Sequence, residues 1–164
     1  MDNKISLNDI TIRRFEEQDA EAVQTLIVRN FLEVNSKDYG MEIMQEVAKT
    51  YDSEKIKRIA SYAHMYVFEY HRQVVGVGSI SSFWGSETES ILLTIFVLPE
   101  LHQNGIGKII MKTLERDEFY LRANRVEIPS SITAVEFYRK FGYDYKNGIK
   151  ELDKENHYLL EKRK

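Results

Sequence analysis

A glycine-containing loop in the second half of the chain is the first place where residue types and spacing suggest chemistry. A strongly apolar run over residues 92–98 is followed by Pro99, by a short loop, and by a helix predicted over residues 105–121 that begins with Gly105 and Gly107. The first N–H groups of a helix lack partners within the helix and carry partial positive charge, so they attract phosphate groups. The spacing therefore predicts that the backbone amides of residues 103–108 hold a phosphate or pyrophosphate.

Two other phosphate-binding patterns fit this loop less well. A Walker-type loop requires Gly-Lys followed by serine or threonine, whereas Ile109 follows Gly107 and Lys108 here. A dinucleotide-binding fingerprint requires a third glycine, and Ile110 occupies its place. A nucleotide-binding domain that uses the same loop for another phosphate stays an alternative.

A second motif lies downstream, where residues 131–143 read SITAVEFYRKFGY. This segment resembles the Asn-x-x-Ala-x-x-Phe-Tyr-x-x-x-Gly-Phe helix of the GCN5-related N-acetyltransferases, the GNAT family. The first loop, with VLP at 97–99 and HQNGIG at 102–107, resembles the acetyl-CoA-binding motif of that family, usually Gln/Arg-x-x-Gly-x-Gly/Ala after Val-x-Pro. Both motifs occur in the family's order, and the resemblance extends over nearly the whole chain.

The resemblance implies acetyl-CoA as a co-substrate and no metal. In the family, the strand before the loop separates from its neighbour, and its backbone pairs with pantetheine; the matching positions are Ile95 and Val97. The cofactor-binding residues implied in this way are Ile95, Phe96, Val97, His102, Gln103, Asn104, Gly105, Ile106, Gly107, Lys108, Ser131, Ala134 and Tyr138. His102 stands where glutamine or arginine is usual, and Ser131 where asparagine is usual. We expect the first departure to matter little, because backbone amides hold the pyrophosphate, and the second to weaken one side-chain contact.

Tyr138 is the predicted general acid. Attack of an amine on a thioester must expel a thiolate, and a phenol with a pKa near 10 can donate a proton to the departing sulfur. The resemblance implies this role for the tyrosine of the Phe-Tyr pair. By spacing alone, Ala134, Phe137, Tyr138 and Phe141 form an apolar helical stripe, so a purely structural role stays open.

The base that accepts the proton of the amine is less well defined by the sequence. Glu127 lies between Val126 and Ile128 in a short strand, so its side chain points to the opposite face of the sheet from both. It could bind or deprotonate an amine there, or it could form a structural ion pair. Glu89, at the start of the central strand, is the other candidate, although a solvated charge at a strand edge explains it as well. An ordered water could also take this role.

The elements that must position these groups alternate along the chain. Alternating or β-rich segments predict strands over 9–15, 65–70, 74–81, 89–98 and 125–128, and helical spacing predicts helices between 19 and 63, over 105–121 and over 131–141. Two last strands are expected to flank Asn147-Gly148, a dipeptide typical of tight hairpins. The order predicts an α+β fold with helices on the faces of the sheet. The resemblance implies that this fold is GNAT-like, with a mixed, mostly antiparallel sheet of about 6–7 strands that separates at its central strands.

Composition bounds the protein class. A chain of 164 residues with 43% hydrophobic and 30% charged residues predicts one globular domain over 1–164, with its core at about 9–162. The net charge of −3 argues against a nucleic-acid partner, and the absence of cysteine excludes thiolate metal sites and a cysteine nucleophile. The start of the chain has no signal-peptide pattern, and no run is long enough to span a membrane, which favours a cytoplasmic location.

The resemblance, with which these features agree, implies an acyltransferase that moves the acetyl group of acetyl-CoA to an amine by direct attack in a ternary complex. The acceptor, a small molecule or a peptide, is expected to enter from the side formed by residues 35–63 and 146–155, where acidic residues gather. The sequence does not identify this amine. A homodimer is compatible with the fold. The main alternative is a non-catalytic domain that binds acyl-CoA or a partner through the same fold.

Overall fold

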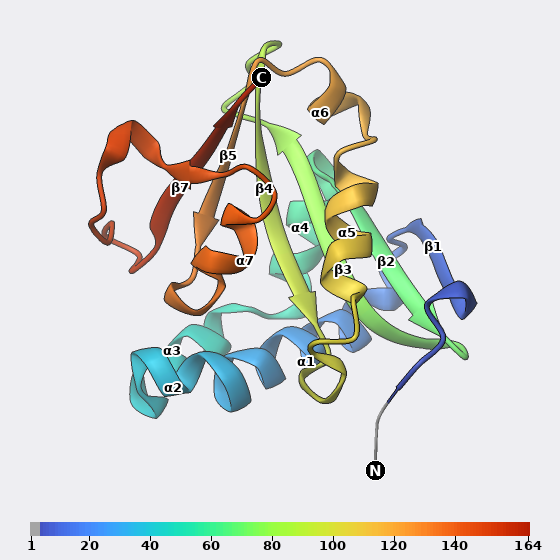
Figure 1. The fold of residues 1–164 in the computed structure, drawn as a ribbon. Helices are drawn as coiled ribbons and strands as arrows, with labels where there is room; N and C mark the ends of the chain where they lie inside the picture. The colour runs from blue at the N-terminus through green and yellow to red at the C-terminus, as the bar shows by residue number, and fades with distance from the viewer. Residues whose placement is uncertain (1–3) are drawn as a thin grey trace.

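A central β-sheet organises the structure, a computed structural model that describes residues 4–164 (Figure 1). Within these residues seven strands pair in the order β1-β2-β3-β4-β5-β7-β6. The β4–β5 pair is parallel, and the other five pairs are antiparallel. The strands are β1 (Ile10–Arg14), β2 (His64–Tyr70), β3 (Gln73–Ser82), β4 (Glu89–Val97), β5 (Arg125–Ser130), β6 (Asp144–Tyr145) and β7 (Tyr158–Arg163). This architecture confirms the predicted mixed, mostly antiparallel α+β sheet.

Helices cover both faces of the sheet. Helices α1 (Ala20–Asn30) and α4 (Ser53–Tyr62) pack on one face, and a π-helical segment, Phe31–Asn35, leads from α1 into α2 (Ser36–Tyr39) and α3 (Met41–Thr50). On the other face, α5 (Ile106–Leu114) and α6 (Glu118–Leu121) pack against β3 and β4. In Figure 1, α5 and α7 (Val135–Arg139) lie in front of the sheet, and α4 lies behind it.

Two predicted helices are shorter than expected. The helix predicted over 105–121 breaks after α5, because the Asp117 side chain accepts a hydrogen bond from the Phe119 amide at 2.9 Å and starts α6 as its N-cap. The helix predicted over 131–141 begins as a 3₁₀ turn, Ile132–Ala134, before α7.

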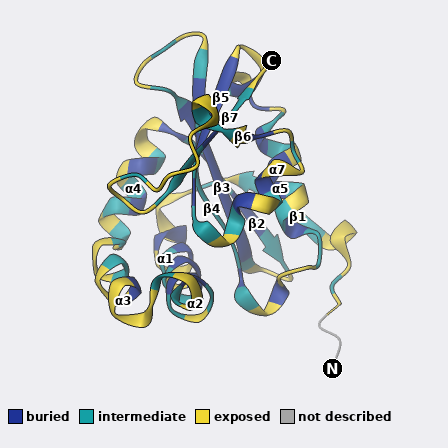
Figure 2. Cartoon of the chain, turned by 60° about the vertical axis from the view of Figure 1, so that its left-hand side comes forward, coloured by how far each residue is buried: buried dark blue, intermediate teal, exposed yellow. Residues whose placement is uncertain are grey.

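The core lies between the sheet and these helices, as the buried centre of Figure 2 shows. The middle of β3 is buried on both faces, and its sequence there consists of aliphatic, glycine and serine residues without a charged side chain. Gly78 in β3 faces α5, and a Cβ atom there would collide with Cγ2 of Ile110. This glycine therefore allows α5 to lie close to the sheet.

The two central strands separate after a short contact. Pairing between β4 and β5 is confined to residues 89–91 and 125–127. Beyond this point the strands diverge, as Figure 1 shows. Thr94 in β4 has a φ of 52°, and the pairing with β3 shifts register beside it, which marks a β-bulge. The predicted separation of the central strands is thus present, and the second half of β4 has one edge without a strand partner among the described residues.

The end of the chain differs from the predicted tight hairpin. Asn147 (φ 55°) and Gly148 (φ 71°) adopt the left-handed turn conformation that this dipeptide favours. The turn belongs to a short 3₁₀ segment, Lys146–Gly148, however, and a further loop precedes β7. The amide of Asn147 donates a hydrogen bond to Oε2 of Glu161 at 3.0 Å, so the turn is held by a side chain instead of a continuous strand ladder.

Candidate active site

The loop between β4 and α5 presents a row of unused backbone amides. Gln103 (φ 65°) and Gly105 (φ 88°) have left-handed backbones that turn the chain into α5. No side chain caps the N-terminus of α5. The amides of residues 103–108 donate no hydrogen bond to any other described residue. Since these donors need acceptors, and a helix N-terminus favours negative charge, the loop is suited to an anion such as pyrophosphate.

The loop is held by side chains that the sequence pattern did not identify for this purpose. The carbonyl oxygen of Val97 accepts a hydrogen bond from Nδ2 of Asn30 in α1 at 2.8 Å. Nε2 of His102 lies 2.9 Å from the same oxygen. Nδ2 of Asn104 donates to the carbonyl of Leu101 at 3.2 Å. These side chains hold the loop through its backbone carbonyl groups and leave its backbone amides free.

The unpaired edge of β4 leads directly into this loop. The amide of Leu98 donates to the carbonyl of Val75 in β3 at 2.9 Å. Because backbone groups alternate in direction along an antiparallel strand, Ile95 and Val97 direct their N–H and C=O groups away from β3, toward the open side. The Val97 carbonyl is already used by Asn30 and His102, so its N–H group is the free one. On the side-chain level, Phe96 packs edge-on against Phe31, with ring centroids 5.5 Å apart.

Helix α7 lies beside the start of α5. An ideal Cβ atom at Gly107 would lie 3.0 Å from Cζ of Phe137, so this glycine makes room for an aromatic ring of α7. The sequence interpretation assigned Gly107 to cofactor approach alone. Ahead of α7, the Ser131 carbonyl accepts hydrogen bonds from Oγ of Ser130 at 2.8 Å and from the Ala134 amide at 3.2 Å.

Tyr138 is buried, with 6% of its surface exposed. Its hydroxyl makes no hydrogen bond with the described residues, and burial raises the pKa of this phenol well above its usual value near 10. The side chain therefore stays protonated at neutral pH, which is the state in which it can donate a proton.

Glu127 belongs to a buried network of ion pairs. It is 4% exposed. Its Oε1 lies 2.9 Å from Nη1 of Arg125 and 2.8 Å from Nζ of Lys146. Arg125 also contacts Glu89 at 2.6 Å and Glu161 at 3.2 Å, and its contact with Glu89 lowers the pKa of that carboxyl group. Both carboxylates considered as bases are thus bound to the same guanidinium.

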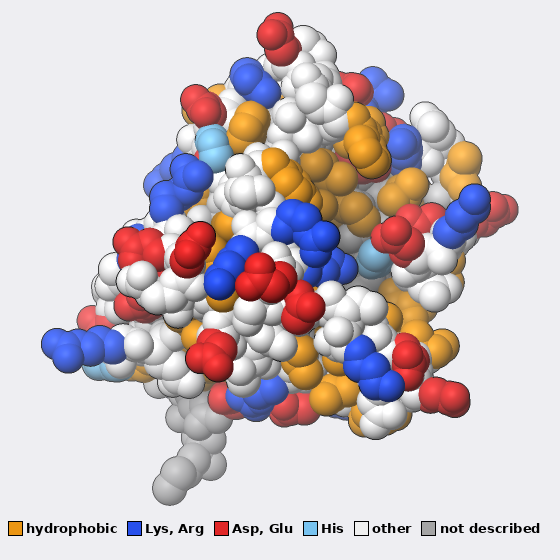
Figure 3. Space-filling model, turned by 180° about the vertical axis from the view of Figure 1, so that it is seen from behind, with side chains coloured by type: hydrophobic (Ala, Val, Ile, Leu, Met, Phe, Trp, Pro, Cys, Tyr) orange, Lys and Arg blue, Asp and Glu red, His pale blue; other side chains and the backbone are white. Residues whose placement is uncertain are grey.

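A hollow of about 420 Å³ lies over Glu127, on the sheet face opposite α5. Ser90 hydrogen-bonds to the carbonyl of Phe119 in α6, so Ile91 and its partner Glu127 face the other way. Figure 3 shows this face, with hydrophobic side chains gathered in a recess and charges of both signs around it. Its lining is aromatic (Phe83, Trp84), apolar (Ile91, Pro129, Leu159) and charged (Glu127, Lys146, Asp153, Lys154, Glu155). The loop at 146–155, expected on the acceptor side, therefore supplies four of the ten lining residues, whereas residues 35–63, expected on the same side, supply none.

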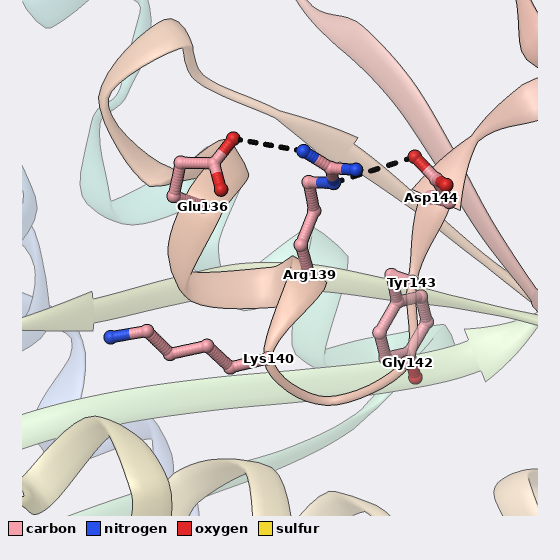
Figure 4. A pocket seen from close by; sticks show the side chains of 6 residues that line it. All are labelled: Glu136, Arg139, Lys140, Gly142, Tyr143 and Asp144. Carbon is pink, nitrogen blue, oxygen red and sulfur yellow. Dashed lines mark hydrogen bonds and ion pairs between the residues drawn. The ribbon is translucent and has the colours of Figure 1, made fainter.

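A second hollow of about 420 Å³ lies at the end of α7 (Figure 4). The Arg139 guanidinium there is paired with Glu136 at 3.2 Å and with Asp144 at 3.5 Å, while the Lys140 side chain extends away from that pair. Arg139 is thus neutralised within the protein and adds little free positive charge for phosphates.

One further contact crosses the open end of the sheet. The hydroxyl of Tyr39 in α2 accepts a hydrogen bond from the Ile132 amide at 2.9 Å and donates to the carbonyl of Asn156 at 2.6 Å. Tyr39, like Asn30, Arg125 and Lys146, was not singled out from the sequence. The hydrogen-bond partners of Asn30 and Tyr39 lie 67 or more residues away in the sequence. Local sequence could therefore have indicated these two residues only through a residue type that is unusual on a helix.

Comparison with known families identifies the protein class. A family model described as an acetyltransferase (GNAT) domain matches residues 31–156. The chain belongs to the GNAT acetyltransferase family. No curated protein sequence matches the chain.

Solved structures share this fold at low sequence identity. The PaiA N-acetyltransferase of Thermoplasma acidophilum, solved with coenzyme A, has a TM-score of 0.80 and 16% identity over 94% of this chain and 99% of that one. Ard1 from Thermoplasma volcanium has a TM-score of 0.67 and 18% identity over 94% and 97%. N-acetylglutamate synthase from Neisseria gonorrhoeae, solved with coenzyme A and N-acetyl-glutamate, has a TM-score of 0.70 and 14% identity over 98% of this chain but 36% of its own.

Two further properties concern residues 4–164. None of the helices in this part of the chain combines the length and apolar character that a membrane crossing requires. The same residues contain no group of three or more histidine and acidic side chains arranged to hold a metal ion.

Proposed function

We propose that this protein is an N-acetyltransferase that moves the acetyl group of acetyl-CoA directly to an amine in a ternary complex, and that one domain of residues 1–164 carries both substrate sites. The observation that supports this best is the row of free amides from Gln103 to Lys108 at the end of an unpaired strand edge. Family membership and the coenzyme A seen with two structural neighbours agree with it.

In this proposal the loop amides hold the pyrophosphate and the edge of β4 holds the pantetheine arm. The residues concerned on β4 are Ile95 and Val97, through their backbones, and Phe96 supports them through its packing against Phe31. His102 and Asn104 keep the loop in shape through its carbonyls. Ser131 and Ala134, just ahead of α7, are proposed to complete the cofactor site, because Phe137 of α7 lies beside Gly107. Because backbone amides hold the pyrophosphate in this proposal, His102 can replace the usual glutamine or arginine.

The free N–H of Val97 is the proposed donor to the thioester carbonyl. Attack of the amine places negative charge on that oxygen, and a preorganised backbone donor stabilises this charge. The elevated pKa of Tyr138 keeps its hydroxyl protonated, and it donates that proton to the departing thiolate.

Glu127 is proposed to act on the acceptor amine. It lies on the floor of the hollow opposite α5, where its carboxylate contacts Arg125 and Lys146. An ionised carboxylate can orient an ammonium group or, with water, accept its proton. Glu89, at the start of β4, is less suited, since it does not line this hollow. The cytoplasmic location stays a prediction, and a homodimer is compatible with the fold.

Thiol release from acetyl-CoA over a panel of primary amines tests this function, with Tyr138→Phe compared to the native chain. Loss of turnover in Tyr138→Phe with retained coenzyme A affinity would support the proton-donor role. If the native protein and Tyr138→Phe turn over acetyl-CoA at the same rate, Tyr138 has no role in the chemical step. Coenzyme A binding without turnover on any amine would favour the non-catalytic alternative, and tighter binding of ATP or NAD would favour a nucleotide-binding domain.

A further inference from the structure

The side chain of Lys146 occupies the hollow over Glu127. Its Nζ lies 2.8 Å from Oε1 of Glu127 and 5.5 Å from the ring centroid of Phe83. A carboxylate together with an aromatic face is a combination that binds ammonium groups, because both attract a cation and the ring also accepts the alkyl stem. The hollow therefore already holds a primary alkylammonium group, supplied by the protein itself.

The ion pairs around Glu127 involve a second cation besides Arg125. The Arg125 guanidinium is shared among Glu89, Glu127 and Glu161. Glu161 also pairs with Arg163 at 3.6 Å, so the carboxylate that depends on Lys146 besides Arg125 is the buried Glu127. A buried carboxylate without a partner is costly. Both cations contact Oε1 of Glu127, and no hydrogen bond from a described residue reaches its Oε2. An incoming ammonium that replaced Lys146 would leave the local charge unchanged.

Lys146 is the cation that can leave. Arg125 is 6% exposed at its side chain and belongs to β5, whereas the Lys146 side chain is 31% exposed. Lys146 is also the first residue of the 3₁₀ segment that follows the two-residue strand β6. Its backbone is therefore anchored to the sheet through the short pairing of that strand with β7. A partly exposed ammonium regains water when it moves out, and an incoming ammonium restores the partner that the buried Glu127 carboxylate needs.

We propose that the hollow formed by Phe83, Trp84, Glu127 and Leu159 binds the primary alkylammonium group of a ligand, and that Lys146 occupies this place until the ligand displaces it. The ligand class is a linear amine with an apolar stem, as a lysine-like side chain has. The inference depends on the proposed function only in identifying this ligand as the acetyl acceptor.

Direct binding of butylammonium, which matches the lysine stem, tests the inference without acetyl-CoA. Trp84 is the only tryptophan of the chain, lines the hollow and is 91% exposed, so its fluorescence reports on occupancy. Removing the competing ion pair with Lys146→Met should tighten butylammonium binding roughly fivefold to tenfold. The matched control is Lys150→Met, which removes the same charge from the same loop outside the hollow and should stay within about twofold of the native protein.

Further variants separate displacement from other effects. Lys146→Arg keeps the charge and should not tighten binding, and Glu127→Gln added to Lys146→Met should abolish the gain. If Lys146→Met does not fold, Lys146→Gln takes its place. Equal affinities for Lys146→Met and Lys150→Met would overturn the inference. A tightened Lys146→Met that transfers no acetyl group would instead count against the proposed function and leave this site in place.

Discussion

Replacing Gly105 by alanine tests whether the left-handed backbone at this position keeps the loop amides in place. Gly105 has a φ of 88°, and its ideal Cβ would lie 3.1 Å from Cδ1 of Leu7, a methyl group that can shift by a few tenths of an ångström. The left-handed conformation costs an L-residue about 1–2 kcal/mol. For a domain of this size each kcal/mol lowers Tm by about 2–4 °C, so we expect a loss of roughly 2–8 °C.

The loop can relieve this strain by rotating its backbone, which would turn the amides of residues 103–108 away from a common ligand. Coenzyme A affinity measured by calorimetry should therefore fall at least about tenfold, the effect of losing one or two hydrogen bonds to a charged group. Gly148→Ala is the matched control, because Gly148 has a φ of 71° with no atom near its ideal Cβ and lies outside the loop. It should lose similar stability and no coenzyme A affinity. Equal coenzyme A affinities in the two variants would refute the reasoning.

Two predictions concern the core. Gly78→Ala should lower the free energy of unfolding, measured in urea, by about 1–3 kcal/mol, because its Cβ atom would collide with Ile110. Gly76→Ala should lower it less, because the atom nearest to its ideal Cβ is the end of a side chain 3.2 Å away. The reverse order of the two losses would contradict this packing. Burial raises the pKa of Tyr143, so the folded state holds this proton more tightly than the unfolded chain, and stability should be unaffected below pH 10 and fall above it. Tyr143→Phe should reduce that fall by up to about 1.4 kcal/mol per pH unit, measured by urea unfolding between pH 9 and about pH 11, and an unchanged slope would exclude this residue as its source.

The parts of this site that follow from local sequence could be predicted. Gly105 and the apolar run before Pro99 define a strand, a turn and a helix start within a few residues, and the structure has these elements where the pattern placed them. The separation of β4 from β5 was expected from the family resemblance, and the pairing confined to residues 89–91 confirms it.

The parts that depend on distant partners could not be predicted. Asn30 looks like an ordinary polar residue on a helix, because the carbonyl group to which its side chain donates a hydrogen bond lies 67 residues away in the sequence. Gly107 was expected only to let the backbone approach the cofactor. The ring of Phe137, which occupies the space beside Gly107, belongs to a different helix, and the sequence does not show that the two helices meet. Asn147-Gly148 was expected to close a tight hairpin because that dipeptide favours left-handed turns, but the same backbone preference also fits the longer loop that the Glu161 side chain supports.

The amides of the loop provide the most direct test of the proposed acetyl-CoA site. Titration of ¹⁵N-labelled protein with coenzyme A should shift the amide resonances of residues 103–108 most strongly, followed by those of Ile95 and Val97. Shifts that instead concentrate on another surface while residues 103–108 stay unchanged would contradict the proposed site.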